Sequence, residues 1–308
     1  MKKLNQSGSH LLALILAIAG IGIIGLAAAR VLRTKQSTII GSPSATSATV
    51  KAEEVVWSFD DKKLQWAPKS GTAPACEQPF TFTQTPIDLT HVTAIGMPGM
   101  YRGFSYKPHG GFRLADATNG QVDIVLPIDA TLTGIKRYYE GQPAELQYLL
   151  NFETACGIAF RLDHLYTLTP AFQKIAETTP EPKINDTRSD PNIPFTRTKF
   201  KAGDVVATAV GSPGIRNFGF DFGVYDYRQR NEISKNPAWT AIHNTYQDTE
   251  WYGVCWLTLM PKEDQATALE LANTVVNPAQ PTRNQTSDYC PNAKYKTLEF
   301  NNGQPTEG

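Results

Sequence analysis

Residues 11–29 constrain this chain more than any other segment. They are nineteen consecutive residues, almost wholly apolar and without a charged side chain. As an α-helix such a run spans roughly 28 Å, close to the hydrocarbon thickness of a bilayer. We therefore predict a single transmembrane anchor at residues 11–29, preceded by a short N-terminal segment, residues 1–10.

Two other interpretations of this run stay open. Ala27-Ala28-Ala29 fits the small-residue cleavage site of a signal peptide, which would make the remainder a secreted protein. Gly8-Ser9 resembles the leader of a prepilin, which would make the chain a pilin-like structural protein of the cell surface. The acidic residue expected shortly after such a leader is missing, since Ala13 stands there. The anchor is the interpretation that we favour.

The sequence beyond the run divides by composition. Residues 30–51 are rich in Ser, Thr and Ala and predict a flexible linker. A folded domain is expected at residues 52–300 and a disordered tail at residues 301–308. Lys and Arg together equal Asp and Glu at 29 each, so the formal net charge is zero. This balance gives no electrostatic support to nucleic-acid binding.

The four cysteines, Cys76, Cys156, Cys255 and Cys290, contain no Cys-x-x-Cys pair, which argues against a structural zinc site. An even number in an exported domain fits two disulfides, for which three pairings exist. We favour Cys255–Cys290 with Cys76–Cys156, while free buried thiols are the alternative.

Short apolar runs separated by Gly, Pro and Asn predict a mainly β domain decorated with loops. Strands are expected at residues 80–82, 122–125, 131–135, 199–210 and 218–227, and the runs 146–152 and 157–162 predict two consecutive strands near the middle of a sheet. Helices are expected at residues 166–178 and 262–274, and an exposed loop at residues 179–194.

Five motifs follow one another in a recognisable order between residues 100 and 228. They are His109-Gly110-Gly111, the segment 125–134 (VLPIDATLTG), Arg161-Leu162-Asp163-His164-Leu165, the segment 200–207 (FKAGDVVA) and the segment 219–226 (GFDFGVYD). This order resembles that of the lysostaphin/LytM-type zinc metallopeptidases. The resemblance implies a duplicated-hybrid-motif β-sheet core at about residues 100–228, with decorated loops and a C-terminal extension.

The resemblance also implies a degenerate active site. His109 matches the first zinc ligand, and His164 matches the active-site histidine of the middle motif. Arg113 stands where the family has an aspartate ligand. Gly219 and Asp221 stand in the places of the two histidines of the last motif. The family's zinc ligands are therefore largely replaced.

A catalytic zinc ion needs three protein ligands and an open position for water. His109, Asp221 and His164 can still form a non-standard site, because carboxylates also bind zinc. Arg113 opposes this, since a guanidinium stays charged and cannot ligate a metal. A salt bridge between Arg113 and Asp221 would then replace the ion. We expect no cofactor, with zinc as the alternative.

An aromatic segment lies late in the domain. Trp239, Tyr246, Trp251, Tyr252 and Trp256 crowd around His243 in the sequence. Flat rings can form a stacking platform for a sugar or a peptide, but Trp-rich segments more often pack in a core, and we favour the core. The histidine is then structural.

Together these features predict a membrane-anchored, non-catalytic metallopeptidase-like domain on the extracytoplasmic side, which binds cell-wall polymer or a surface partner protein. The alternatives are an active zinc metallopeptidase that hydrolyses peptidoglycan through a non-standard metal site, and the pilin-like surface protein.

Overall fold

The computed structural model describes residues 53–102, 105–184, 196–272 and 286–291, with two short strands at 300–301 and 304–305. The chain separates into two units, Met1–Val50 and Lys51–Gly308, and every described element belongs to the second. The expected anchor and linker, and the leader and cleavage sites proposed as alternatives, lie outside the described residues. Within those ranges no helix is long and apolar enough to cross a membrane.

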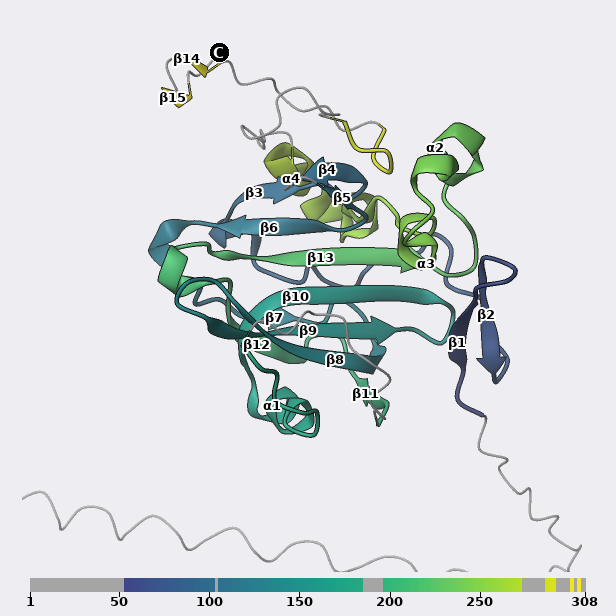
Figure 1. The fold of residues 1–308 in the computed structure, drawn as a ribbon, viewed down its shortest axis with the longest axis horizontal. Helices are drawn as coiled ribbons and strands as arrows, with labels where there is room; N and C mark the ends of the chain where they lie inside the picture. Colours follow the sequence, from purple (N-terminus) through teal and green to yellow (C-terminus); the bar gives the residue numbers. More distant parts are fainter. Residues whose placement is uncertain are drawn as a thin grey trace, which may run out of the picture. The chain divides into compact units, whose positions relative to one another are not determined.

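A nine-stranded sheet forms the centre of the domain (Figure 1). Its strands are β3 (Val92–Gly96), β6 (Gly110–Leu114), β7 (Ile124–Val125), β8 (Ala130–Glu140), β9 (Glu145–Glu153), β10 (Ile158–Leu168), β11 (Thr198–Phe200), β12 (Val205–Val210) and β13 (Gly219–Asp226). The order is β11-β8-β9-β10-β13-β6-β3, while β12 pairs with β10 and β7. All neighbours are antiparallel. The expected mainly β class is confirmed.

The two central strands are the ones that the sequence predicts most clearly. The apolar run 146–152 lies in β9, and the run 157–162, except for Gly157, lies in β10; the two strands neighbour each other in the middle of the sheet. Gly157 permits the tight turn between them, with φ of +95°. A side chain there would also collide with the Trp57 ring, 2.6 Å from the position of a Cβ. Glycine is therefore required at this turn.

The core lies against one face of the sheet, because alternate residues of a strand point to opposite faces. In β13, Phe220, Phe222 and Val224 are buried in the main hydrophobic cluster. Gly219, Asp221 and Gly223 are the intervening residues and lie on the other face. A second cluster, built around Ala159, Tyr225, Trp239, Trp251 and Tyr252, is separate from the main core.

Smaller elements surround the sheet. The hairpins and short pairs are β1 (Val56–Asp60) with β2 (Gln65–Ser70), β4 (Met100–Arg102) with β5 (Ser105–Lys107), and β14 (Phe300–Asn301) with β15 (Gln304–Pro305), which lies partly in the tail expected to be disordered. The helices are α1 (Pro170–Ala176), α2 (Pro237–Ile242), α3 (Gln247–Glu250) and α4 (Lys262–Ala272). Five 3-10 helices cover Leu89–His91, Asp116–Thr118, Pro213–Ile215, Ile233–Lys235 and Trp256–Leu259 among the described residues.

Several element predictions need correction. Residues 80–82 form no strand, and Phe82 instead enters the core while its N–H donates to the Leu259 carbonyl. The helix expected at 166–178 begins only at Pro170, because β10 continues to Leu168 through its pairing with β12. Proline suits the first turn of a helix, and the residue before it favours an extended backbone.

Both expected disulfides are confirmed. Cys76 is bonded to Cys156 and Cys255 to Cys290, which accounts for all four cysteines. The first joins the segment before β3 to the turn between β9 and β10, and the second joins residues 286–291 to the segment between α3 and α4.

Candidate functional site

The sheet changes its pairing at His164. Strand β10 pairs with β13 up to the partners Asp163 and Asp221, and from Leu165 onward it pairs with β12. On its other side the register with β9 shifts between Leu162 and Leu165. His164 lies at this irregularity with φ of +63°, in the left-handed region that non-glycine residues rarely adopt. The junction therefore turns the His164 side chain out of the regular alternation of β10.

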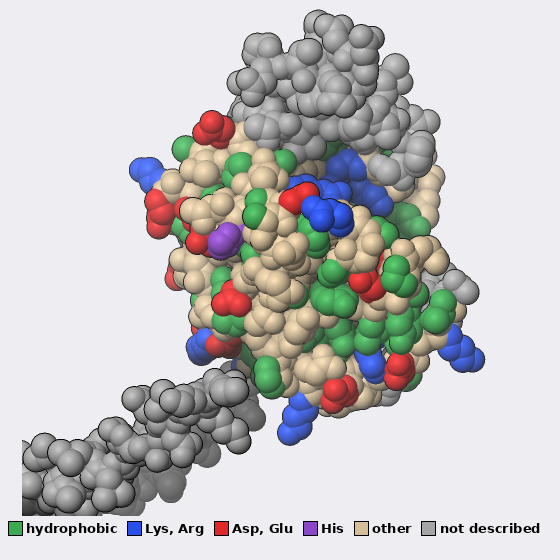
Figure 2. All heavy atoms as spheres, turned by 90° about the vertical axis from the view of Figure 1, so that its left-hand side faces the viewer, with side chains coloured by type: hydrophobic (Ala, Val, Ile, Leu, Met, Phe, Trp, Pro, Cys, Tyr) green, Lys and Arg blue, Asp and Glu red, His purple; other side chains and the backbone are tan. Residues whose placement is uncertain are grey.

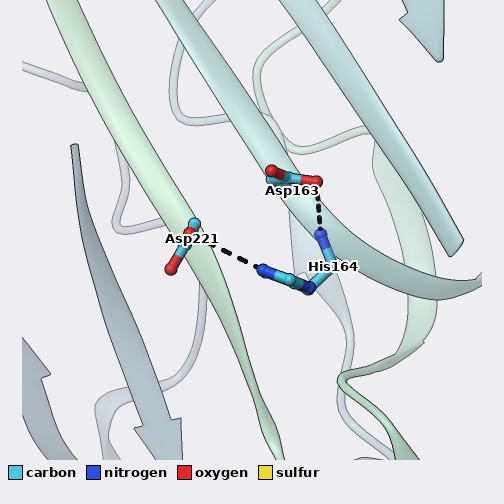
Figure 3. Close-up of side chains that lie close together, drawn as sticks. All are labelled: Asp163, His164 and Asp221. Atoms are coloured by element: carbon cyan, nitrogen blue, oxygen red, sulfur yellow. Dashed lines mark hydrogen bonds and ion pairs between the residues drawn. The ribbon is translucent and has the colours of Figure 1, made fainter. Parts of the chain in front are cut away.

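The His164 ring lies between carboxylates of two strands. Its Nδ1 is 2.8 Å from Gln147 Oε1 and 3.2 Å from Glu140 Oε2. Its Nε2 is 3.7 Å from Asp221 Oδ2 and points toward it, as Figure 3 shows. Because both neighbours of Nδ1 are acceptors, this nitrogen carries a proton. The ring thus connects the end of β8 with the middle of β13.

Asp221 also receives a hydrogen bond from His109, the residue that precedes β6. The His109 Nε2 lies 2.9 Å from Asp221 Oδ2. Gly111 is the partner of Asp221 on β6, and a Cβ on Gly111 would lie 2.8 Å from Asp221 Oδ1. The absence of a side chain at Gly111 allows the carboxylate to lie over the strand and reach the imidazole.

Asp163 organises the rest of the cluster. It is fully buried, and its Oδ1 accepts from the Tyr138 hydroxyl at 2.6 Å and from the His164 backbone N–H at 2.9 Å. Its Oδ2 accepts from the Arg161 guanidinium at 2.5 Å. A buried carboxylate with this many donors and a paired cation is stabilised in its charged form. Asp163 therefore holds the backbone of His164 at the junction.

The protonation states of the histidines differ. Burial lowers the pKa of His109 to about 4, because desolvation outweighs the attraction of Asp221, and the Arg161 charge acts in the same direction. Burial alone would raise the pKa of Asp221, but the contact with His109 and the charge of Arg102 hold it well below its usual range. At neutral pH an uncharged His109 thus donates to an ionised Asp221.

For His164, burial opposes the charged form, but the hydrogen bond to Glu140 and the charges of Asp163 and Asp221 outweigh it. The pKa of His164 is therefore raised above its usual value. Three carboxylates on three strands favour the imidazolium form.

The structure brings together three of the four candidate residues. His109, His164 and Asp221 meet at the Asp221 carboxylate, whereas Arg113 does not join them. The Arg113 guanidinium donates to the Asn217 side chain, so the expected Arg113–Asp221 salt bridge is wrong. Asp221 is engaged by His109 instead. Gly219 lies opposite Arg113 in the sheet and offers no side chain.

Three side chains of the cluster lie close enough together to bind a metal ion, but one of them is already fully hydrogen-bonded. Asp163, His164 and Asp221 each offer one ligand atom, and these atoms lie within 4.8 Å of one another. Both oxygens of Asp163 already accept hydrogen bonds, however, and Arg161 holds a permanent positive charge against this carboxylate. These three side chains therefore suit a hydrogen-bonded cluster better than a zinc site, which needs three available protein ligands.

The aromatic segment packs as a core. Trp239, Trp251, Tyr252 and Trp256 are buried, and only Tyr246 of the set is exposed. His243 is also buried, stacks on Trp239 with ring centroids 4.0 Å apart, and bonds Glu250 Oε2 through Nδ1 at 3.0 Å. These contacts match the expected structural role of this histidine.

The sequence assigned no role to five residues of the cluster: Tyr138, Glu140, Gln147, Arg161 and Asp163. Arg161 and Asp163 stand beside His164 in a motif and were the easiest to find. The other three lie on β8 and β9, and only strand pairing places them near His164.

Comparison with known proteins identifies no relatives: no protein-family model, no curated protein and no solved structure matches this chain. The likeness to the LytM-type peptidases rests on the order of the motifs.

Proposed function

We propose that the folded domain is a non-catalytic, peptidase-like binding domain on the extracytoplasmic side, held to a membrane by residues 11–29. Its polar cluster binds cell-wall polymer or a surface partner protein. One observation carries this proposal. His109, which matches a zinc ligand of the resembled family, and Asp221, which stands in the place of another, are hydrogen-bonded to each other at 2.9 Å.

Charge supports the same proposal. Three negative charges come from Glu140, Asp163 and Asp221. They are offset by the guanidinium groups of Arg102 and Arg161 and by His164, whose raised pKa favours its charged form. A dication would have to enter a site that is already close to neutral, against two fixed guanidinium groups.

The location is supported by the disulfides, which form and persist outside the reducing cytosol. Nucleic acid is a poor partner on electrostatic grounds. On the face shown in Figure 2, a few basic side chains gather beside an acidic one, and the other charged side chains of both signs lie scattered among hydrophobic ones.

The decisive experiment is metal analysis of the purified full-length protein, combined with sedimentation on cell-wall sacculi. We expect far less than one zinc per chain, no release of wall fragments, and co-sedimentation with sacculi or capture of a surface protein. Stoichiometric zinc that is lost in His109→Ala but kept in His91→Ala, an exposed histidine, would overturn the proposal.

An active zinc metallopeptidase is the second candidate. The observation in its favour is that the ligand atoms of Asp163, His164 and Asp221 lie within 4.8 Å of one another. Release of peptide fragments from sacculi that stops on addition of a chelator would establish this alternative.

A further inference from the structure

A pocket with a volume of about 500 Å³ is formed by α2 and the segment that precedes it, and this volume is within the range of small-ligand sites. The side chains that line it are Gln229, Arg230, Ser234, Lys235, Pro237 and Thr240. Pro237 and Thr240 belong to α2 (Figure 1), and the other four precede it in the chain. No carboxylate is among these lining residues, so every side chain that faces the pocket is either neutral or positively charged.

The guanidinium of Arg230 is held in one orientation. Its central carbon lies 3.9 Å from the ring centroid of Trp251, a buried residue whose indole N–H donates to the His243 carbonyl. Its Nη2 donates to the Ser234 carbonyl at 2.5 Å, and its Nε donates to Ser234 Oγ at 3.4 Å. Because stacking and hydrogen bonds fix the guanidinium in advance, a ligand that binds to it loses little free energy in ordering the side chain.

Arg230 carries a charge that no carboxylate neutralises within the part of the chain that the structure describes, and its Nη1 makes no hydrogen bond there. The other cation of the pocket, Lys235, is paired with Glu232 at 2.5 Å, and Glu232 does not line the pocket. The pocket therefore has one unbalanced positive charge, on a partly buried side chain, and this charge favours a ligand with a single negative charge.

Three donor groups remain available to such an anion. Arg230 offers the N–H bonds of Nη1. Gln229 uses one amide N–H on a neighbouring carboxylate and keeps the other, and Lys235 uses one of its three N–H bonds on its acidic partner. The hydroxyls of Ser234 and Thr240 already donate to backbone carbonyls, so they do not add to these donors.

We propose that this pocket binds a phosphodiester group. A phosphodiester has one negative charge, as the charge of the pocket requires, whereas a phosphate monoester has about 1.5–2 at pH 7. Its tetrahedral oxygens accept from donors on several sides, and the volume of the pocket also admits the groups esterified to the phosphate. A carboxylate has the same charge but fills little of this volume. One unbalanced charge differs from the basic groove that follows a nucleic-acid backbone.

Three small probes test the proposal on the full-length protein. Dimethyl phosphate is a singly charged diester, trimethyl phosphate is its neutral analogue, and acetate has the same charge on a planar group. Binding is followed by calorimetry and by NMR shifts of the side-chain N–H groups of Arg230 and Trp251. We expect saturable binding of dimethyl phosphate and binding of the other two that is at least about tenfold weaker. The inference is wrong if dimethyl phosphate does not bind saturably, or if either of the other two binds equally well.

Two variants locate the site. Arg230→Met removes the unbalanced charge and should weaken dimethyl phosphate at least about tenfold. Because Arg230 also bonds Ser234, the second variant is Gln229→Ala, at an exposed position, which should keep the fold and weaken the probe about threefold or more. Arg216→Met removes an exposed arginine that pairs with Asp116 outside the pocket, and this matched control should bind normally. Unchanged affinity in Gln229→Ala, or in a folded Arg230→Met, would refute the proposal.

A phosphodiester can belong to a wall polymer or to a lipid headgroup, and two measurements distinguish these sources. Co-sedimentation with sacculi that is lost in Arg230→Met, and also lost after hydrofluoric acid has cleaved the phosphodiesters of the sacculi, would identify a polymer. Binding of a soluble short-chain phosphatidylglycerol that is tighter than that of dimethyl phosphate, and is lost in Arg230→Met, would identify a headgroup. Either result supports the pocket as a phosphodiester site.

The inference goes beyond the proposed function, because none of the residues that line the pocket belongs to the cluster around Asp221. Stoichiometric zinc together with saturable binding of dimethyl phosphate would remove the proposed function and keep the pocket. Sacculi that bind the wild type and Arg230→Met equally, without any binding of dimethyl phosphate, would keep the proposed function and remove the pocket.

Discussion

His109 Nε2 donates to Asp221 Oδ2 across 2.9 Å, between the start of β6 and the middle of β13. The contact joins two residues whose positions resemble those of metal ligands, and each provides what the other lacks. The buried, uncharged imidazole donates a hydrogen bond to a carboxylate that remains ionised. This pair leads to a prediction about acid stability.

We predict that His109 makes the domain sensitive to acid. An unfolded histidine titrates near 6.5, whereas the native pKa of His109 is about 4. Between these values the unfolded state binds more protons than the native state. The free energy of unfolding should therefore fall by about 3 kcal/mol as the pH drops from about 6.5 to 4.

Urea unfolding across this pH range measures the effect. His109→Gln keeps a donor for Asp221 but does not titrate, so it should remove this part of the slope. His91→Gln, at an exposed position, should not. His164 acts with the opposite sign, because its raised pKa gives stability below pH 6.5 that is lost as pH rises through its native pKa. Equal slopes for wild type and His109→Gln would contradict the prediction.

Asp163→Asn should be strongly destabilising. The change leaves the partly buried Arg161 without the fully buried carboxylate that it pairs with, and breaking a buried pair costs about 3–5 kcal/mol. Chemical denaturation provides the measurement. Asp129→Asn, which breaks an exposed pair with Lys201, is the matched control and should cost much less. Similar losses for both variants would show that Asp163 does not hold the junction.

The left-handed backbone of His164 predicts an unusual ranking of substitutions. At an ordinary strand position glycine is less stable than alanine by roughly 0.5–1 kcal/mol. At His164, with φ of +63°, alanine is strained and glycine is not, so His164→Gly should be more stable than His164→Ala by about 1 kcal/mol. Thr167, exposed in the same strand, should show the ordinary ranking. Thermal unfolding of the glycine and alanine variants at His164 and at Thr167 tests this ranking, and the same order of stability at both positions would contradict it.

Each disulfide should contribute substantially to stability. The sequence separations are 80 for Cys76–Cys156 and 35 for Cys255–Cys290, and loops of this length are stabilised by about 4 kcal/mol through the entropy of the unfolded chain. Paired Cys→Ser variants, compared by denaturant unfolding without reductant, should each lose about this amount. A paired variant as stable as wild type would show that the disulfide it removes does not stabilise the domain.

The sequence by itself determined the local elements and the cross-links. The runs in β9 and β10 are apolar enough to predict central strands, and the cysteine count with the expected export predicts two disulfides. These features depend on residues close together in the chain, or on the few possible pairings of four cysteines.

The tertiary structure alone decided which side chains form the site. Arg113 follows the first motif and Asp221 lies in the last, and the sequence predicts a salt bridge between them, but Arg113 bonds Asn217 and Asp221 bonds His109. Glu140 reaches His164 only because β10 changes partners there. Contacts across strands depend on register, and a shift by one residue moves a side chain to the opposite face. Local sequence carries little information about such a shift, so the cluster around Asp221 emerges only when the strands are paired.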